Sequence, residues 1–402
     1  MQRRTVVYFL LFVLGLGFFM EGNAQLTNLD YEKLVEVKKA IQNEDANYLP
    51  AYLKLINEAD KALDEGPFSV MQKKQVAASG DKHDYLSLAP YWWPDPEKKN
   101  GLPWIRKDGL VNPMTRGNNV DDPAKDRFIA NAQVLSLAYF FSSEKKYAKK
   151  VQQLLKVWFL DEATRMNPNL EHAQGIPGKN TGRGFGIIEF SGISHIITAI
   201  EILELKNTLP QQMGAGLKKW LNDYLLWLQT SDFGVFEKTR NNNHGSLYDV
   251  QVVSLLMFFG KTEEAKAVLN SVFKERISVQ IEADGSQPHE IKRTKGLTYS
   301  ILNLSALTRL AFYGKKLGVK LWERTSEEGD LKKAYDFLYA YLDDKNIWPY
   351  EQLGSMEKAI ERLRRMFVNS GSMMGISDYC DVLAQLKNVE DIQQLIYPCM
   401  AE

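Results

Sequence analysis

The sequence is poor in cysteine and has no excess of charge of either sign. Only Cys380 and Cys399 occur among 402 residues. Neither lies in a CxxC or CxH pattern, so neither a zinc site nor a disulfide-rich scaffold is indicated. The two could form one disulfide near the C-terminus or remain thiols. The 50 Lys and Arg balance 50 Asp and Glu, which argues against a nucleic-acid-binding protein. A polyanionic ligand would need a local cluster of cations.

The N-terminal segment is predicted to be a targeting signal. Arg3 and Arg4 precede an almost wholly apolar run, 6–20, and small residues of the kind that signal peptidase reads end at Ala24. The run is short for a membrane span, which needs about 20 residues. We expect cleavage after residues 1–24, a secreted or periplasmic protein, and no membrane attachment of the mature chain. A retained N-terminal anchor is the alternative.

The rest of the chain shows helical periodicity, and no run of alternating apolar residues predicts a long strand. Pro and Gly are largely excluded from the predicted helices, which are 31–41, 48–63, 125–141, 147–159, 187–205, 213–228, 248–259, 262–279, 299–316, 331–342 and 355–367. A solenoid should repeat at a fixed period, and no such repeat is present. The sequence therefore predicts an all-α fold, an α/α toroid or incomplete barrel, formed by residues 25–402 as one domain.

Four connections between predicted helices exceed the 2–8 residues usual in helical bundles. They are residues 78–122, 164–186, 230–246 and 282–298, each rich in Gly, Pro, Asn, aromatic or cationic residues. Functional sites are often built from long loops on a rigid scaffold. Because these loops fall between alternate helix pairs, we expect them to converge on one end of the toroid.

The first connection contains DYLSLAPYWWPDP, residues 84–96. Prolines on both sides of Tyr91, Trp92 and Trp93 stiffen this segment and prevent a helix. Three adjacent aromatic side chains suit stacking on sugar rings, because Tyr and Trp each combine an apolar ring face with a polar group at the tip. The alternative is a loop packed over the core, with Trp as a plug.

The second connection ends in GRGFGIIE, residues 182–189. Glycines on either side let the backbone approach a ligand closely and present Arg183 at the start of a helix. The planar guanidinium group of Arg183 can donate hydrogen bonds to both oxygens of a carboxylate. The alternative is a structural ion pair of Arg183 with Glu189 or Glu171.

The third connection contains RNNNHG, residues 240–245. Consecutive asparagines are poor helix-interior residues and good side-chain donors at a loop–helix junction, so Asn242 and Asn243 are candidate substrate-binding residues. His244 is a candidate base or a donor to a substrate carboxylate. A lone histidine is more often structural, but the flanking Asn run and Gly245 favour a functional role.

The fourth connection contains DGSQPHEIKRTKGLTYS, residues 284–300. It offers His289, Glu290, Lys292 and Arg293 as candidate site residues, followed by Tyr299 at the start of a helix. Neighbouring cations favour the phenolate form, so we expect the pKa of Tyr299 to be lowered. The alternative is that Tyr299 only packs in the core.

These residue types fit β-elimination on a uronate. The C6 carboxylate must be neutralised before the C5 proton can leave, a role suited to Asn243, His244 and Arg293, with Arg183 a weaker candidate. A base takes the C5 proton and an acid protonates the departing O4. Tyr299 fits the acid, and for a syn elimination also the base; His244 is the other candidate base. The scheme requires no metal or cofactor.

Together, DYLSLAPYWWPDP, GRGFGIIE, NNNHG and DGSQPHEIKRTKGLTYS resemble the alginate lyase family, which has an α/α-toroid fold. The resemblance covers roughly half of the chain, from Asp84 to Tyr299. It implies uronan lyase activity on an anionic polysaccharide, and a site lined by an Asn-His pair, an Arg and a Tyr. We expect a monomer that acts on alginate, with glucuronan as the alternative polymer.

Two other classes of protein remain open from the sequence. An inverting glycoside hydrolase on a similar toroid would use two carboxylic acids about 6.5–9.5 Å apart, for example Glu189 with Asp284 or Glu290. A non-catalytic glycan-binding protein of the outer membrane would also be helical and rich in aromatic residues. Such proteins are usually anchored through an N-terminal lipidated cysteine, which this sequence does not place near residue 24.

Overall fold

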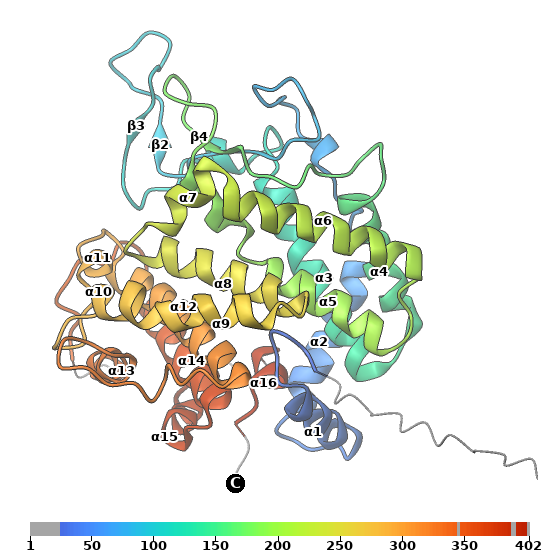
Figure 1. Ribbon diagram of the computed structural model, residues 1–402, viewed down its shortest axis with the longest axis vertical. Helices are drawn as coiled ribbons and strands as arrows, with labels where there is room; N and C mark the ends of the chain where they lie inside the picture. The colour runs from blue at the N-terminus through green and yellow to red at the C-terminus, as the bar shows by residue number, and fades with distance from the viewer. Residues whose placement is uncertain (1–24, 344–345, 387–390, 400–402) are drawn as a thin grey trace, which may run out of the picture.

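The computed structural model describes residues 25–343, 346–386 and 391–399 (Figure 1). The predicted targeting signal, residues 1–24, lies outside the described residues, so its cleavage stays a prediction. The long helices are α1 (Tyr31–Gln42), α2 (Leu49–Leu63), α3 (Asp122–Ser142), α4 (Lys145–Phe159), α5 (Ile193–Leu205), α6 (Gln211–Thr230), α8 (Asn243–Phe258), α9 (Thr262–Val272), α12 (Gly296–Leu317), α13 (Leu331–Tyr339) and α14 (Met356–Met374).

The shorter elements lie in the connections and near the C-terminus. The short helices are η1 (Val70–Gln72), η2 (Pro113–Arg116), η3 (Gly184–Phe190), α7 (Asp232–Lys238), η4 (Phe273–Ile277), α10 (Ser278–Gln280), α11 (Pro288–Ile291), α15 (Ser377–Cys380), η5 (Asp381–Gln385) and α16 (Gln393–Ile396). The strands are β1 (Leu86–Leu88), β2 (Trp92–Trp93), β3 (Ile105–Arg106) and β4 (His172–Gly175).

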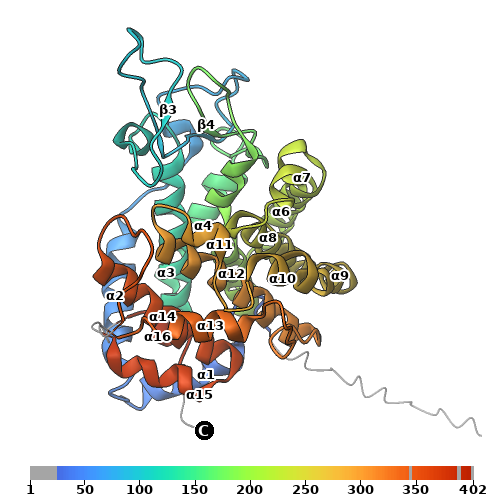
Figure 2. The ribbon, with the colours of Figure 1, turned by 90° about the vertical axis from the view of Figure 1, so that its left-hand side faces the viewer.

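Inner and outer helices alternate along the chain, and their burial patterns explain why. In α8 every residue from Tyr248 to Leu256 is buried, so this helix must be surrounded by others. In α4 the buried side chains include Tyr147, Val151, Leu154 and Trp158, which share one face. Helices α3, α5, α8 and α12 are therefore inner, and α2, α4, α6, α9 and α14 cover them from outside. This arrangement is the predicted α/α toroid (Figures 1 and 2).

Adjacent inner helices pack against one another and against their outer partners. Helix α3 packs against α2, α4 and α5, α8 packs against α9 and α12, and α12 packs against α14. One stretch, Gly184–Leu205, is long and apolar enough to span a membrane by length and composition. It includes the inner helix α5, and 67% of its most apolar window is buried inside the fold, as expected of a core helix.

The structure corrects the predicted elements in three places. The predicted helix 187–205 is broken, because the 3-10 helix η3 ends at Phe190 and α5 begins at Ile193. Residues 230–246 are not one loop, because they contain α7 and the start of α8; the side chain of Asn242 caps α8 by accepting from the His244 amide at 3.2 Å. The predicted helix 262–279 is interrupted by a π-helical turn, Phe273–Ile277. Such turns accommodate an extra residue in a helix.

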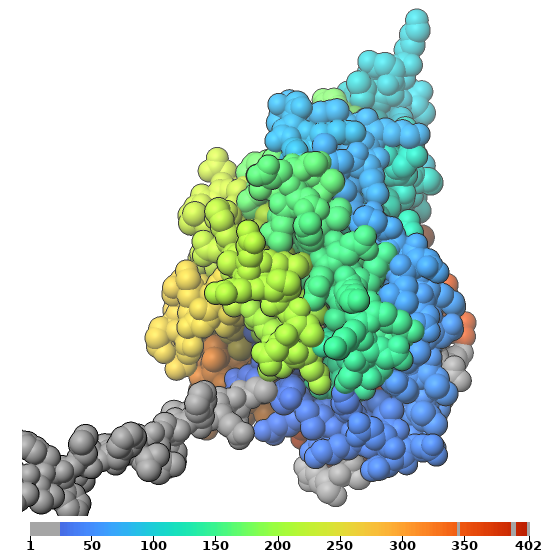
Figure 3. Space-filling view, turned by 90° about the vertical axis from the view of Figure 1, so that its right-hand side faces the viewer, coloured from blue at the N-terminus to red at the C-terminus, as the bar shows by residue number. Residues whose placement is uncertain are grey.

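Two small strand pairs organise the longest connections at one end of the toroid. Strand β1 pairs in parallel with β4, and β2 pairs with β3 in an antiparallel hairpin. Ala89, Trp104 and Ile176 form a separate apolar cluster beneath this hairpin. Figures 1 and 3 show these loops projecting beyond the helical body at the same end. The sheet pairs therefore position the loops that carry the site.

The opposite end is closed by the start and the end of the described chain. Leu26 to Leu29 are buried against inner helices, and the Thr27 amide donates to both carboxylate oxygens of Glu201 at 3.1 and 3.0 Å. Near the C-terminus, Cys380 and Cys399 form a disulfide with a Cα–Cα distance of 5.5 Å. This bond decides between the two alternatives that the sequence left open.

Candidate active site

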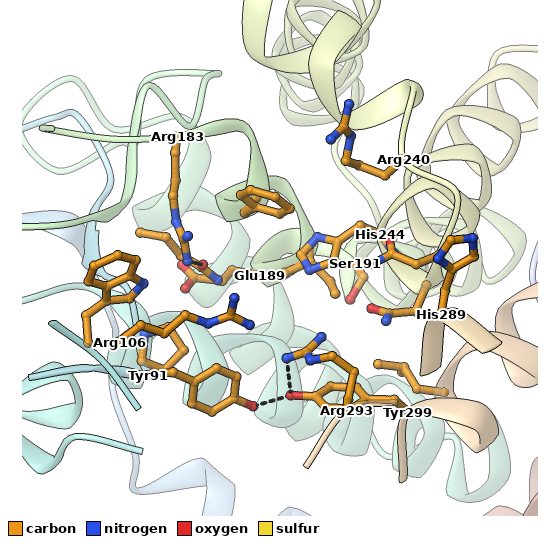
Figure 4. Close-up of a pocket in the computed structure, with 18 of the residues that line it drawn as sticks. Tyr91, Arg106, Arg183, Glu189, Ser191, Arg240, His244, His289, Arg293 and Tyr299 are labelled. Carbon is orange, nitrogen blue, oxygen red and sulfur yellow. Dashed lines mark hydrogen bonds between the residues drawn. The ribbon is translucent and has the colours of Figure 1, made fainter. Parts of the chain in front are cut away.

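A cleft of about 900 Å³ lies at the loop-bearing end, and residues from all four long connections line it. The predicted convergence of these loops is therefore confirmed. Figure 4 shows His244 on one side of the cleft and Tyr299 with Arg293 on the other. From the predicted set, the lining residues are Tyr91, Trp92, Arg183, Asn242, Asn243, His244, His289, Lys292, Arg293 and Tyr299.

Positive charge is concentrated in this cleft although the whole chain is neutral. Its basic lining residues are Arg106, Arg116, Lys125, Arg183, Arg240, Lys292 and Arg293. Its acidic lining residues are Asp122, Asp126 and Glu189. This surplus is the local cation cluster that a polyanionic ligand requires, and a concave site focuses its field.

Tyr299 lies in the first turn of α12, and its hydroxyl is hydrogen-bonded on two sides. The Tyr91 hydroxyl lies 2.7 Å away, and the Arg293 guanidinium donates to the Tyr299 oxygen at 3.3 Å (Figure 4). Burial, together with Tyr91, raises the pKa of Tyr299 well above its usual value and outweighs the opposing effect of Arg293. The expectation of a lowered pKa was wrong, because desolvation penalises the phenolate.

Arg293 is held in place by a carboxylate from a distant loop. Its Nε and Nη2 donate to the two oxygens of Asp108 at 3.0 and 2.8 Å, a bidentate pair. Burial opposes ionisation of Asp108, but hydrogen bonds from Arg293 and Arg106 hold its pKa well below the usual range. Arg293 therefore keeps its position in the cleft before any substrate arrives.

Asn243 is fixed from behind by Glu290. The Asn243 backbone amide donates to Glu290 Oε1 at 2.7 Å, and its side-chain Nδ2 donates to Oε2 at 2.8 Å. Glu290 is only 1% exposed and does not line the cleft. It was predicted to bind substrate, but the structure places it as the support of Asn243. Burial raises the pKa of Glu290, whereas the bonds from Asn243 oppose this shift.

His244 has a buried carboxylate behind it as well. Its Nδ1 lies 2.6 Å from Oε1 of Glu237, a residue of α7 with 0% exposure. The Phe185 ring packs edge-on against the imidazole, with 5.0 Å between ring centroids. The Glu237 carboxylate can only accept a hydrogen bond, so this contact favours the tautomer with the proton on Nδ1. In that tautomer Nε2 is unprotonated and free to accept a proton from a ligand.

Arg183 does not form the structural ion pair that was the alternative to ligand binding. Its Nη2 donates to Gln174 Oε1 at 2.6 Å, while the Glu171 carboxylate accepts from Trp227. Burial lowers the pKa of Arg183 to about 10. Gly182 is required before it, because a Cβ there would lie 1.9 Å from the Glu171 carbonyl oxygen.

Trp93 is the other predicted residue that does not line the cleft. Its indole Nε1 donates to the Leu110 carbonyl at 3.0 Å, and Lys107 lies 5.3 Å from its ring. Trp93 therefore stabilises the loop, but it packs against neither apolar core cluster, so it is not the core plug of the alternative. Trp92 lines the cleft and is covered on one side by Lys179, whose Nζ lies 4.2 Å from the ring centroid.

Three residues that position the site were not predicted from the sequence: Asp108, Gln174 and Glu237. None belongs to a motif that suggests chemistry. Glu237 lies seven residues before His244, and treating α7 as a helix would have indicated that an acid on it could reach the next helix start. Within the described ranges, no group of three or more His, Cys, Asp or Glu side chains could hold a metal ion.

Comparisons with known proteins place this site in a family. The family model for alginate lyase matches residues 69–348. The structure is similar to a crystal structure of an alginate lyase from Bacteroides ovatus, with 36% identity, a TM-score of 0.89, and coverage of 94% of this chain and 100% of the other. A search of curated proteins finds no match.

Two further structures share the fold at lower identity. Alginate lyase A1-III from Sphingomonas species A1 is 16% identical with a TM-score of 0.52, covering 87% of this chain and 96% of the other. A tyrosine-to-phenylalanine variant of alginate lyase A1-III complexed with a tetrasaccharide is 13% identical with a TM-score of 0.56, covering 94% and 97%. By the extent of the family match and the likeness to the Bacteroides ovatus enzyme, this chain belongs to the alginate lyase family and is a polysaccharide lyase.

Proposed function

We propose that the chain cleaves alginate by β-elimination at the uronate C5, giving unsaturated oligosaccharides. The observation that carries the proposal is the Tyr299 hydroxyl, held by Tyr91 and Arg293 in a cation-rich cleft that also presents Asn243 and His244. The Bacteroides ovatus structure is that of an alginate lyase, which supports alginate as the polymer.

Neutralisation of the substrate carboxylate is assigned to Arg293 and Asn243, with His244 as a third donor only when its Nε2 carries a proton and it is therefore not the base. Arg293 and Asn243 are already oriented by Asp108 and Glu290, so their positions need little reorganisation when substrate binds. Donors fixed in advance stabilise charge that develops in the transition state more than mobile donors do. These donors would withdraw negative charge from C6 as the C5 proton leaves.

Proton transfer is assigned to Tyr299 and His244. Because its pKa is raised, Tyr299 carries its proton at neutral pH and can protonate the departing O4. In mannuronate the C5 hydrogen and O4 lie on the same ring face. Tyr299 would serve both transfers there only after its own proton has passed to solvent: the phenolate, paired with Arg293, takes the C5 proton and then donates that proton to O4. In guluronate the C5 hydrogen and O4 lie on opposite faces, and His244 Nε2, on the other side of the cleft, would accept the C5 proton.

The acid pairs named for the hydrolase alternative do not meet across the cleft. Of the three carboxylates it could have used, only Glu189 lines the cleft. Glu290 is buried behind Asn243. Asp284 accepts from the Ser286 amide at 2.9 Å, and this bond holds the pKa of Asp284 below its usual value. No pair of opposed carboxylates is therefore formed from this set.

Replacing Tyr299 with Phe tests the assignment. The variant should lose the unsaturated, ultraviolet-absorbing product while still binding a saturated oligouronate in calorimetry. Tyr147→Phe is the matched control, because Tyr147 is a buried tyrosine bonded to Asp60 on an outer helix, away from the cleft. A Tyr299→Phe enzyme that keeps most of its turnover would overturn the assignment of Tyr299.

We also propose that the mature protein is an exported monomer whose first residue is Gln25. The basic start, the apolar run and the small residues ending at Ala24 support this proposal. The mass of the protein secreted by a bacterial host would test the cleavage point, and sedimentation would test the monomer. A mass that includes residues 1–24 would favour the retained anchor.

A further inference from the structure

Most cations of the cleft already have a carboxylate partner. Arg293 and Arg106 share Asp108, and Arg116 and Lys125 share Asp122. Among the described residues, Arg183, Arg240 and Lys292 line the cleft without an ion pair to any carboxylate. Their charge is thus available to a ligand.

Two of these three, Arg183 and Arg240, stack on a pair of aromatic rings, Phe185 and Phe236, which we call the aromatic shelf. The Arg183 guanidinium carbon lies 5.0 Å from the Phe185 ring centroid, and that of Arg240 lies 4.1 Å from the Phe236 centroid. The two rings pack edge to face at 5.1 Å. Stacking on an aromatic face fixes a guanidinium while leaving its N–H edge for hydrogen bonding.

The hydrogen bonds that these arginines make are to neutral oxygens. Arg183 donates to Gln174 Oε1 at 2.6 Å, and Arg240 donates to its neighbour Thr239 Oγ1 at 2.8 Å. The Nε atoms of both are buried with no hydrogen-bond partner in the described structure. Glu189 and Glu237 act on the charge of Arg183 from a distance, but neither comes within ion-pair range. Neither Arg183 nor Arg240 is therefore neutralised by a carboxylate of the described structure.

The shelf is built next to the reacting groups. Phe185 packs against the His244 ring, and Arg240 directly precedes the Asn run that leads into α8. The turn is tight, because a Cβ on Gly245 would lie 2.0 Å from the Arg240 carbonyl oxygen. Figure 4 shows Arg183 and Arg240 well apart from each other, both on the His244 side of the pocket, with Arg293 and Tyr299 opposite.

We propose that Arg183 and Arg240 form a second, extended subsite, in which each contacts a carboxylate of a uronate neighbouring the sugar that undergoes elimination. The inference rests on the proposed function, since a polyuronate carries one carboxylate on every sugar. Arg293 and Asn243 bind the carboxylate of the reacting sugar, so Arg183 and Arg240 are left to bind the carboxylates of neighbouring sugars along the polysaccharide. This subsite makes the enzyme selective for a polyanion over a chain with neutral sugars beside the scission point.

Arg240→Met is the informative variant, because Met keeps an apolar side chain over Phe236 and removes the charge. Loss of a charge-assisted hydrogen bond should raise KM on polymeric alginate roughly tenfold, with kcat within about twofold. Raising the salt concentration should weaken binding by the wild type more than by the variant. The shortest oligouronate that is still cleaved, if it does not reach the shelf, should show the same KM in both.

Arg127→Met is the matched control, since Arg127 also stacks on a phenylalanine, Phe68 at 4.9 Å, but does not line the cleft. It should leave KM unchanged. An Arg240→Met enzyme with wild-type KM on the polymer would overturn the subsite, as would an equal loss of kcat on all chain lengths. The latter result would show a structural role acting through His244.

The subsite and the proposed function can fail separately. If wild-type enzyme forms the unsaturated product and Arg240→Met has unchanged KM, only the subsite is wrong. If wild type forms no such product, the function is wrong, and calorimetry with saturated oligoguluronate and oligomannuronate still tests the subsite. Weaker binding by Arg240→Met than by Arg127→Met would then support it, and equal binding would contradict it.

Discussion

Replacing Glu237 with Gln should disable His244 without disturbing the fold. The two side chains have nearly the same volume, and Glu237 is fully buried, so no cavity forms. The 2.6 Å contact with His244 Nδ1 would change character, because the Gln amide can present its NH2 group to that nitrogen. The imidazole would then favour the tautomer with its proton on Nε2, which can no longer accept the C5 proton.

General-base catalysis contributes about 10² to 10⁴ in rate, and a wrong histidine tautomer can remove most of it. We therefore expect Glu237→Gln to lower kcat on polyguluronate on the order of 10² or more, and to lower it less on polymannuronate. The assay is the initial rate of ultraviolet absorbance on each polymer. Glu264→Gln, an exposed glutamate of α9 paired with Lys261, is the control. A folded Glu237→Gln enzyme with more than half of the wild-type kcat on polyguluronate would refute the reasoning.

Three other perturbations have expected outcomes. Asp108→Asn removes one charged acceptor from the bidentate pair with Arg293, so kcat/KM should fall roughly tenfold or more; an unchanged value would mean that Arg293 needs no such support. Burial raises the pKa of Glu201 to about 7. Protonated Glu201 therefore stabilises the fold, by on the order of 3 kcal/mol, at pH values below the ordinary pKa of a glutamate, and this contribution is lost as pH rises through about 7. Glu201→Gln should flatten that pH dependence in urea denaturation, and a parallel decline in the variant would contradict the assignment. Reducing the Cys380–Cys399 disulfide, with a sequence separation of 19, should cost about 3 kcal/mol; equal urea midpoints with and without reductant would show that the bond adds nothing.

The helical toroid could be predicted because helix periodicity is a local property. The continuous burial of α8 and the single buried face of α4 both follow from their own residues. Helix α7 was missed because it has only seven residues and lies in an Asn-rich connection. With it, the position of Glu237 was missed as well.

The reacting groups were predictable from residue type, whereas their supports were not. Asp108 and Arg293 are 185 residues apart, and no local pattern links them. The pKa of Tyr299 was misjudged for the same reason, because its burial and its contact with Tyr91 are tertiary effects that sequence neighbours do not reveal. Trp93 was assigned to the substrate because adjacent aromatics look alike in sequence, although the loop turns it towards Leu110.

The most direct test of the central claim is the product formed by the purified wild-type enzyme on polymannuronate, polyguluronate and glucuronan. We predict new reducing ends that appear together with ultraviolet absorbance on at least one alginate polymer, with no absorbance from Tyr299→Phe. Absorbance on glucuronan alone would support β-elimination but would show that the substrate is glucuronan and not alginate. Reducing ends without absorbance would contradict β-elimination itself.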